Sequence, residues 1–218
     1  MIDLHTHTFM SDGALVASEL IRRASCEGYR YLAITDHADA SNLEGVIEAA
    51  RKAAASICRH WDIRVIAGVE LTHIPPAAIP ELVAEARAIG AEIVVVHGET
   101  IVEPVQPGTN RAAIRGGADI LSHPGLISRA DARMAARRGV HLEITTRGGH
   151  SLANGHVAQV ARATGAPLVL GTDSHGPGDL TTRERAEKIA LAAGMSPAEV
   201  KRMFANAERL AKAKTGEQ

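Results

Sequence analysis

The stretch Glu92-Ile93-Val94-Val95-Val96-His97 shows the pattern that decides the fold, a short apolar run that stops at a histidine. Such runs, rich in β-branched residues, are typical of strands buried on both faces of a parallel sheet. Six similar runs occupy residues 2–4, 31–35, 64–69, 119–122, 140–144 and 167–171, and stretches of helical pattern separate them. The alternation predicts parallel βα units. No linker or repeat divides the chain, so we expect one α/β domain over residues 1–218.

Almost every one of these runs is followed by a residue type that binds metal ions. These residues are His5 and His7, Asp36 and His37, Glu70, His97, His123, and Asp173 and His175. In a closed parallel barrel the carboxyl ends of all strands converge on one face, where active sites lie. In an open sheet, strand ends several positions apart could not all meet. The sequence therefore favours a barrel.

The spacing of these residues predicts a metal centre. His5 and His7 stand two residues apart on a strand, so both imidazoles face the same side, and Asp173 and His175 repeat this spacing. A buried carboxylate such as that of Glu70 needs a cation. Each pattern is weak alone, but nine candidate ligands exceed the roughly four that one zinc ion takes. They suit two or three divalent ions, and imidazole with carboxylate fits Zn, Mn or Fe equally.

Composition excludes several kinds of partner. The net charge of -1 argues against an extended nucleic-acid surface or an anionic membrane surface. Only five aromatic residues are present, which argues against stacking along a single strand. No apolar run approaches the roughly 20 residues of a membrane span. Because the N-terminal residues lack a signal pattern and the two cysteines form no CxxC pair, we expect a cytoplasmic protein.

Several motifs together resemble the PHP (polymerase and histidinol phosphatase) family. They are His5-Thr6-His7-Thr8, Ser11-Asp12-Gly13, Thr35-Asp36-His37, Gly68-Val69-Glu70, His97, Ser122-His123-Pro124 and Thr172-Asp173-Ser174-His175. The resemblance implies a distorted, TIM-like (β/α)7 barrel with a trinuclear metal site for phosphoester hydrolysis. It implies a first ion on His5, His7, Glu70 and Asp173, a second on Glu70, His97 and His123, and a third on Asp12, His37 and His175.

The resemblance also suggests catalytic roles for Asp12, Asp36 and His175. Asp36 matches an acidic residue of the family's second motif, and we expect it to orient a histidine or a metal-bound water. Metal ions lower the pKa of bound water from about 16 toward 7, so a hydroxide between two ions would attack phosphorus in line. Asp12 or His175 would then lie near the leaving alkoxide.

The loop after the sixth run offers groups for the substrate. Arg147 precedes two glycines and His150. An arginine grips phosphate with two donors, and glycines let the backbone approach closely. We therefore predict that Arg147 and His150 bind substrate. Glu99 is a weaker candidate, the Glu103–Pro107 stretch is expected to be a loop, and His60, His73 and His156 receive no role.

The sequence favours a phosphatase of small molecules over three alternatives. Histidinol phosphate and a nucleotide are the candidate substrates, and the oligomeric state stays open. One alternative is a 3′-5′ exonuclease or phosphodiesterase on short nucleic acids. Another is an amidohydrolase-type C–N hydrolase, although no lysine ends a later strand here. The last is a non-catalytic assembly subunit, which we would expect to have lost metal ligands.

Overall fold

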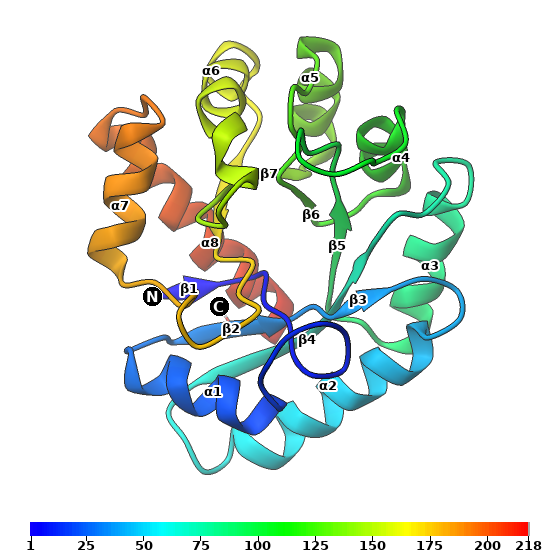
Figure 1. The fold of residues 1–218 in the computed structure, drawn as a ribbon, viewed down its shortest axis with the longest axis vertical. Helices are drawn as coiled ribbons and strands as arrows, with labels where there is room; N and C mark the ends of the chain where they lie inside the picture. Colours follow the sequence, from blue (N-terminus) through cyan, green and yellow to red (C-terminus); the bar gives the residue numbers. More distant parts are fainter. Residues whose placement is uncertain (218) are drawn as a thin grey trace.

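A ring of parallel strands forms the centre of the computed structural model, which describes residues 1–217 (Figure 1). The strands are β1 (Ile2–Asp3), β2 (Tyr31–Ile34), β3 (His37–Ala38), β4 (Arg64–Leu71), β5 (Ile93–His97), β6 (Ile120–Ser122), β7 (His141–Thr145) and β8 (Leu168–Gly171). Their order is β1-β2-β4-β5-β6-β7-β8, and β3 pairs with β4 just beyond the end of β2. All seven predicted runs are strands, and the distorted α/β barrel is confirmed.

Helices connect successive strands and form the outer layer. They are α1 (Ala17–Cys26), α2 (Leu43–Ile57), α3 (Ile79–Ile89), α4 (Thr109–Gly116), α5 (Arg129–Arg138) and α6 (Asn154–Thr164), with the short 3-10 helix η1 (His150–Ala153) before α6. Gly90 and Gly139 end α3 and α5 with φ angles of 109° and 70°, a conformation that other residues adopt at a cost. These sharp ends return the chain to the next strand.

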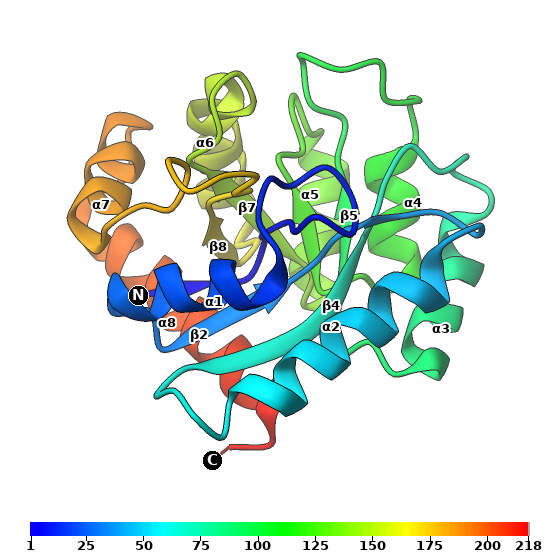
Figure 2. The ribbon, with the colours of Figure 1, turned by 60° about the horizontal axis from the view of Figure 1, so that its bottom comes forward.

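Two apolar layers hold the barrel together. Inside the ring, Leu4, Ile66, Ile93 and Val95 pack with other side chains of the strands. A larger cluster fills the space between the strands and the outer helices. The chain ends with α7 (Arg183–Ala192) and α8 (Pro197–Thr215), and α8 lies beside β1 and β2 in both ribbon views (Figure 2). Ala207 of α8 belongs to the interior cluster, so this helix helps to close the ring.

The ring closes where the first and last strands end. Asp173 N–H donates to the carbonyl of His5 at 3.0 Å, and His7 N–H donates to the carbonyl of Ser174 at 2.9 Å. These bonds form a seam just past β1 and β8, at the carboxyl ends of both strands. The seam places residues 5–7 beside residues 173–175, so candidate ligands from the two ends of the chain become neighbours.

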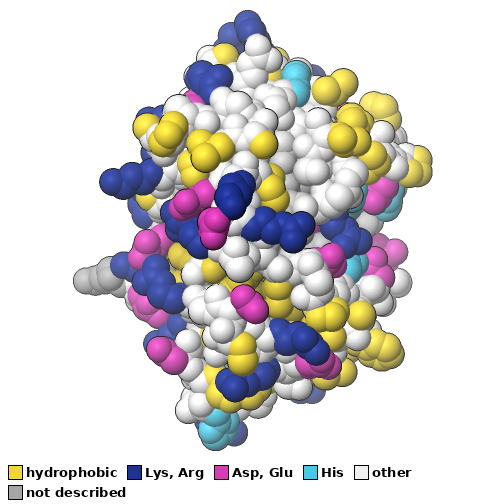
Figure 3. Space-filling view, turned by 60° about the vertical axis from the view of Figure 1, so that its left-hand side comes forward, with side chains coloured by type: hydrophobic (Ala, Val, Ile, Leu, Met, Phe, Trp, Pro, Cys, Tyr) yellow, Lys and Arg dark blue, Asp and Glu magenta, His cyan; other side chains and the backbone are white. Residues whose placement is uncertain are grey.

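The surface carries charges of both signs. On the face shown in Figure 3, basic and acidic side chains alternate without a large region of either sign. Exposed pairs on α7, such as Arg183 with Glu187 and Lys188 with Glu184, contribute to this mixture. Across residues 1–217, no helix combines the length and apolar character needed to span a bilayer.

Candidate metal centre

The barrel brings the nine metal ligands that the resemblance implies to one end of the ring. Eight of them stand at or just beyond the carboxyl ends of strands, and Asp12 comes from the loop between β1 and α1. The positions agree with the convergence expected of a parallel barrel. The ligand atoms of eight of them gather in overlapping groups, which are His5–His7–Glu70, His5–His123–Asp173 and His7–Asp12–His37–His175. His97 lies outside these groups and gathers with His73 and Glu103.

Glu70 lies at the middle of this centre and is fully buried. Its Oε1 lies 3.2 Å from Nε2 of His5 and accepts a 2.6 Å hydrogen bond from the Ser122 hydroxyl, while Oε2 lies 2.9 Å from Nδ1 of His37. Burial alone would raise the pKa of Glu70, but the His5 and His37 imidazoles outweigh it and hold that pKa well below its usual value. The carboxylate is therefore charged at neutral pH and available to a cation.

A second carboxylate faces the same imidazoles from the opposite end of the chain. Asp173 Oδ1 lies 3.2 Å from Nε2 of His7, and Oδ2 lies 3.7 Å from Nε2 of His123. The Nε2 atoms of His5 and His7 are 3.1 Å apart. Ligands at about 2.1 Å from one tetrahedral ion lie about 3.4 Å from one another. The spacing of these atoms is therefore close to that of a coordination sphere.

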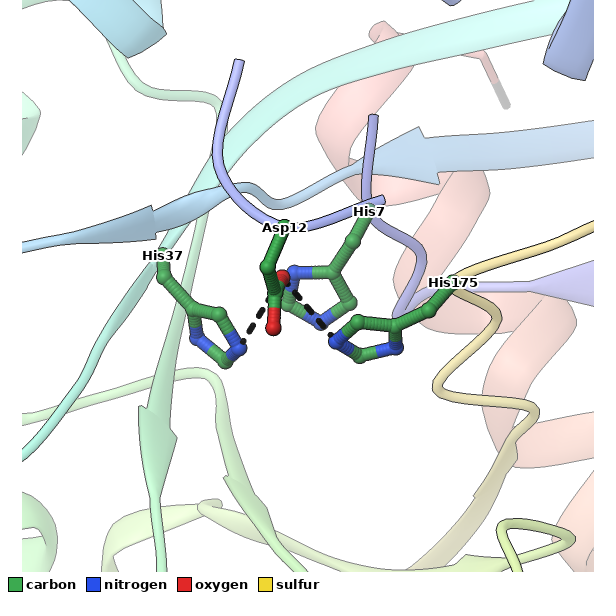
Figure 4. Close-up of side chains that lie close together, drawn as sticks. All are labelled: His7, Asp12, His37 and His175. Atoms are coloured by element: carbon green, nitrogen blue, oxygen red, sulfur yellow. Dashed lines mark ion pairs between the residues drawn. The ribbon is translucent and has the colours of Figure 1, made fainter. Parts of the chain in front are cut away.

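Asp12 and three imidazoles form the outer part of the centre, as Figure 4 shows. Asp12 Oδ1 lies 3.1 Å from Nε2 of His175 and 3.6 Å from Nε2 of His37. The rings of His37 and His175 each lie 4.2 Å from the ring of His7. Partial burial opposes ionisation, yet a hydrogen bond from His175 and the charge of His37 lower the pKa of Asp12. These four side chains could hold an ion next to the deeper group.

Unpartnered polar atoms test whether these residues fit metal ions. Among residues 1–217, most buried side-chain atoms without a hydrogen-bond partner belong to this centre, including Nδ1 of His7, His97 and His123. Such atoms are rare in native proteins because each carries a desolvation cost. Asp173 and His123 also have positive φ angles, of 53° and 24°, which are strained for residues other than glycine. Oε2 of Glu70 also lacks a hydrogen-bond partner, and the set of imidazoles and carboxylates around it fits divalent cations.

Neighbouring polar groups orient the candidate ligands. Glu143 Oε2 lies 2.7 Å from Nδ1 of His5, which leaves Nε2 of His5 free to face the centre. The Thr72 hydroxyl lies 2.6 Å from Nδ1 of His37. Asp3 shares a face with His5. Its Oδ1 accepts a hydrogen bond of 3.1 Å from the backbone N–H of Thr172 across the seam.

The side chain of Asp36 contacts the loop that follows His7. Its carboxylate accepts hydrogen bonds of 2.6 and 2.7 Å from the N–H and hydroxyl of Thr8 and one of 2.8 Å from Ser11. The sequence-based expectation is that Asp36 orients a histidine or a metal-bound water. In the structure these bonds hold the loop on which Asp12 is carried, and the expected role toward a metal-bound water stays a prediction.

Sequence reasoning missed a further carboxylate, that of Glu103. Its Oε2 lies 3.1 Å from Nε2 of His97 and 3.3 Å from Nε2 of His73. The His97 hydrogen bond lowers the pKa of Glu103 to about 2, against a smaller opposing effect of burial. His97 makes no ion pair with Glu70 within 4.0 Å in the described residues. The one available signal was position, because Glu103 follows His97 in a loop at the carboxyl face.

The predicted substrate residues, Arg147 and His150, line a cavity at this end of the barrel together with several candidate metal ligands. It has a volume of about 280 Å³ and is lined by Asp12, His37, Thr72, His73, His97, Glu103, Arg147, His150, Asp173 and His175. Arg147 Nε lies 3.8 Å from Asp173 Oδ2, and Nη1 lies 3.2 Å from Asp179. His150 Nδ1 lies 2.7 Å from the Thr100 hydroxyl. Glu99, the weaker candidate, accepts hydrogen bonds from backbone N–H groups at the start of α4, which gives it a structural role.

An α/β barrel that gathers six histidines and three carboxylates at one mouth defines a class of metal-dependent barrel proteins. Comparison with known sequences identifies the class further, since the PHP domain pattern matches residues 3–96. An uncharacterized protein of Methanocaldococcus jannaschii is 48% identical over 91% of this chain and 92% of its own length. The chain belongs to the PHP domain family.

Two further proteins are similar to this chain. A protein of Edwardsiella ictaluri named “Probable phosphatase” is 32% identical over 80% of this chain and 78% of its own length. Among solved structures, a Listeria monocytogenes protein provisionally named histidinol phosphatase matches with a TM-score of 0.62 and 15% identity, covering 85% of this chain and 99% of that one. At this identity the second likeness concerns the fold alone.

Proposed function

We propose that the protein is a metal-dependent phosphatase that hydrolyses a small-molecule phosphomonoester. The observation that carries this proposal is the single cavity at which candidate metal ligands and Arg147 meet. The relative named as a phosphatase and membership of the PHP family support the same function. Histidinol phosphate and nucleotides remain the candidate substrates.

The residues would hold two or three divalent ions in the sets that the resemblance implies. His5, His7, Glu70 and Asp173 would bind one ion, Glu70, His97 and His123 a second, and Asp12, His37 and His175 a third. Bound Zn, Mn or Fe would neutralise phosphate oxygens and lower the pKa of a water molecule in the site. The protein positions this chemistry inside a small cavity of about 280 Å³.

Other side chains act on the substrate itself. Arg147 is partly exposed beside Asp173 and can turn its guanidinium toward a bound phosphate, with two N–H donors matching two oxygens. His150 lines the same cavity and offers a further donor. Asp12 and His175, 3.1 Å apart, would stabilise the leaving oxygen. Asp36 would contribute through the loop that carries Asp12.

The positions of the lysines argue against an amidohydrolase-type site with a bridging lysine. The chain has five lysines, Lys52, Lys188, Lys201, Lys212 and Lys214, and all lie on α2, α7 or α8. None of the described lysines lines the cavity. The cavity, at about 280 Å³, is also small for an extended nucleic acid, so we favour a small ester.

A substrate panel tests this function. The metal-loaded protein, prepared with Mn and separately with Zn, is assayed on phosphomonoesters, phosphodiesters and amides. We expect turnover of one or more monoesters, while activity confined to diesters or amides would contradict the proposal. His97→Ala should abolish turnover and leave the circular dichroism spectrum unchanged. The control is His60→Ala, because His60 lies outside the cavity.

A further inference from the structure

Three side chains at the mouth of the cavity converge on a point beside the second implied ion site, with which they share His97. We call this group the mouth cluster, and it consists of His73, His97 and Glu103. His73 follows β4, His97 ends β5, and Glu103 lies in the loop between β5 and α4. One ligand atom from each lies within 4.8 Å of the other two. The three residues thus come from two adjacent strand ends and one loop.

The spacing within the mouth cluster is close to that of a coordination sphere. Glu103 Oε2 lies 3.1 Å from Nε2 of His97 and 3.3 Å from Nε2 of His73. Two ligands of a tetrahedral ion at metal–ligand distances of about 2.0–2.2 Å are separated by about 3.4 Å. The three ligand atoms therefore need to move apart only slightly to admit an ion. Two imidazoles and one carboxylate are a ligand set that divalent transition-metal ions accept.

The loop that carries Glu103 is held by contacts on either side of it. Glu99 Oε1 accepts hydrogen bonds of 3.0 Å from Gly108 N–H and 2.9 Å from Asn110 N–H. Asn110 Oδ1 in turn accepts from Glu99 N–H at 2.9 Å. A Cβ added at Gly125 would collide with the Glu99 carbonyl oxygen, so the next loop also packs closely here. The two ends of the loop are thus fixed on either side of Glu103.

A third histidine orients the carboxylate of Glu103. His150 Nε2 lies 3.3 Å from Glu103 Oε1, the oxygen that does not face His97. The Thr100 hydroxyl lies 2.7 Å from Nδ1 of His150. If Thr100 donates to Nδ1, then Nε2 of His150 carries the proton that Glu103 accepts. This is the usual support for a metal-binding carboxylate, in which one oxygen is fixed and the other stays free.

The mouth cluster contains no competing cation from lysine or arginine. All ion-pair partners of Glu103 in residues 1–217 are histidines, namely His73, His97 and His150. His73 has a φ of 53°. The other two non-glycine residues with positive φ among residues 1–217 are His123 and Asp173, which belong to the deeper centre. Strain of this kind accumulates at functional sites.

We propose that the ion held by His97 is also bound by His73 and Glu103, so that one divalent transition-metal ion lies at the mouth of the cavity. The inference deepens the proposed function and depends on it only in requiring that the protein binds metal. It adds two ligands, His73 and Glu103, to those that the family resemblance implies. An ion placed here would meet the substrate as it enters.

Metal binding to the full-length protein tests the proposal without any substrate. Chelator-treated wild type, Glu103→Gln and His73→Gln are titrated with Co²⁺, and binding is followed by visible absorption and by metal analysis after desalting. We expect each variant to bind one ion per chain fewer than wild type, or to bind that ion at least tenfold more weakly. Glu81→Gln is the matched control, since Glu81 lies on α3 outside the cavity.

The outcomes separate this inference from the proposed function. Equal ion number and affinity in wild type and both variants would overturn the mouth ion while leaving the deeper centre in place. Binding of no ion by the wild-type protein would overturn both. Should the variants fold poorly by circular dichroism, crystals of the wild-type protein soaked in Zn²⁺ decide the matter. Anomalous density within bonding distance of Glu103 supports the proposal, and density only beside Glu70 contradicts it.

Discussion

The deep group and the mouth cluster use the same residue types in different settings. In the deep group, His5, His7, Glu70 and Asp173 are all buried, and their backbone belongs to strands or to the seam between them. In the mouth cluster, His73 and Glu103 are exposed and their backbone belongs to loops. The contrast suggests that the barrel itself fixes the deep ligands, whereas loop contacts fix the outer ones. Substitutions should therefore have effects that decrease from the deep group outward.

The largest effect is expected at Glu70. Glu70→Gln keeps the size of the side chain but removes the charge that faces His5 and His37. Lewis-acid stabilisation by an ion is worth several kcal/mol, so we expect kcat to fall about 10³-fold or more. Steady-state kinetics and metal analysis measure the change. Near-normal kcat with full metal content would show that Glu70 is not a metal ligand. The contrast between the deep group and the mouth cluster would then not hold.

A smaller effect is expected at Glu143, which contacts Nδ1 of His5, the ring nitrogen that does not face the metal centre. Glu143→Gln weakens the 2.7 Å contact that orients His5. Loss of such support typically lowers metal affinity by about 10–100-fold. Competition with a chromophoric chelator measures the affinity, and added metal should restore activity. Affinity equal to wild type would mean that the barrel alone orients His5.

At the mouth, Arg147 should affect substrate binding more than chemistry. Arg147→Lys keeps the charge but removes the paired N–H donors that match two phosphate oxygens. We expect KM to rise about tenfold with a change in kcat of less than about threefold, since a hydrogen bond to a charged group contributes roughly 1.5–3 kcal/mol. Steady-state kinetics separate the two constants. A fall in kcat at unchanged KM would place Arg147 in the chemical step.

The smallest effect concerns pH in the metal-free protein. The hydrogen bond from His97, opposed by partial burial, lowers the pKa of Glu103 to about 2. The stabilisation from a lowered carboxyl pKa is present above its ordinary value of about 4.5 and disappears as pH falls toward 2. Urea unfolding of chelated wild type and Glu103→Gln should therefore give free energies that differ at about pH 6 and approach one another at about pH 3. A constant difference would show that Glu103 stabilises the loop by packing.

Much of the fold was predictable because buried parallel strands leave a strong local pattern. Each apolar run is short. Glu70, His97 and Asp173 lie at or just beyond the carboxyl ends of β4, β5 and β8, respectively. The barrel then follows from the need for these residues to meet. The convergence of the nine candidate ligands at one end was predictable for the same reason.

The mouth cluster was not predictable, because loop residues have no period that fixes their direction. His73 and Glu103 lie far apart in the sequence, and only the folded loop between β5 and α4 brings them together. The contacts of Asp36 with Thr8 and Ser11 depend equally on loop geometry. Glu143 can be recognised from strand alternation as facing the interior, but its pairing with His5 requires the register across the ring.

The seam between the two ends of the chain has a consequence for biosynthesis. His5 leaves the ribosome early, whereas its neighbours Asp173 and Ser174 are made much later in translation. A nascent chain that lacks β8 can hold His5 and Glu70 but has no Asp173 to complete the deep group. With Asp173 as a ligand, as proposed, complete metal loading would follow synthesis of most of the chain, so that chain synthesis and metal acquisition would be separated in time.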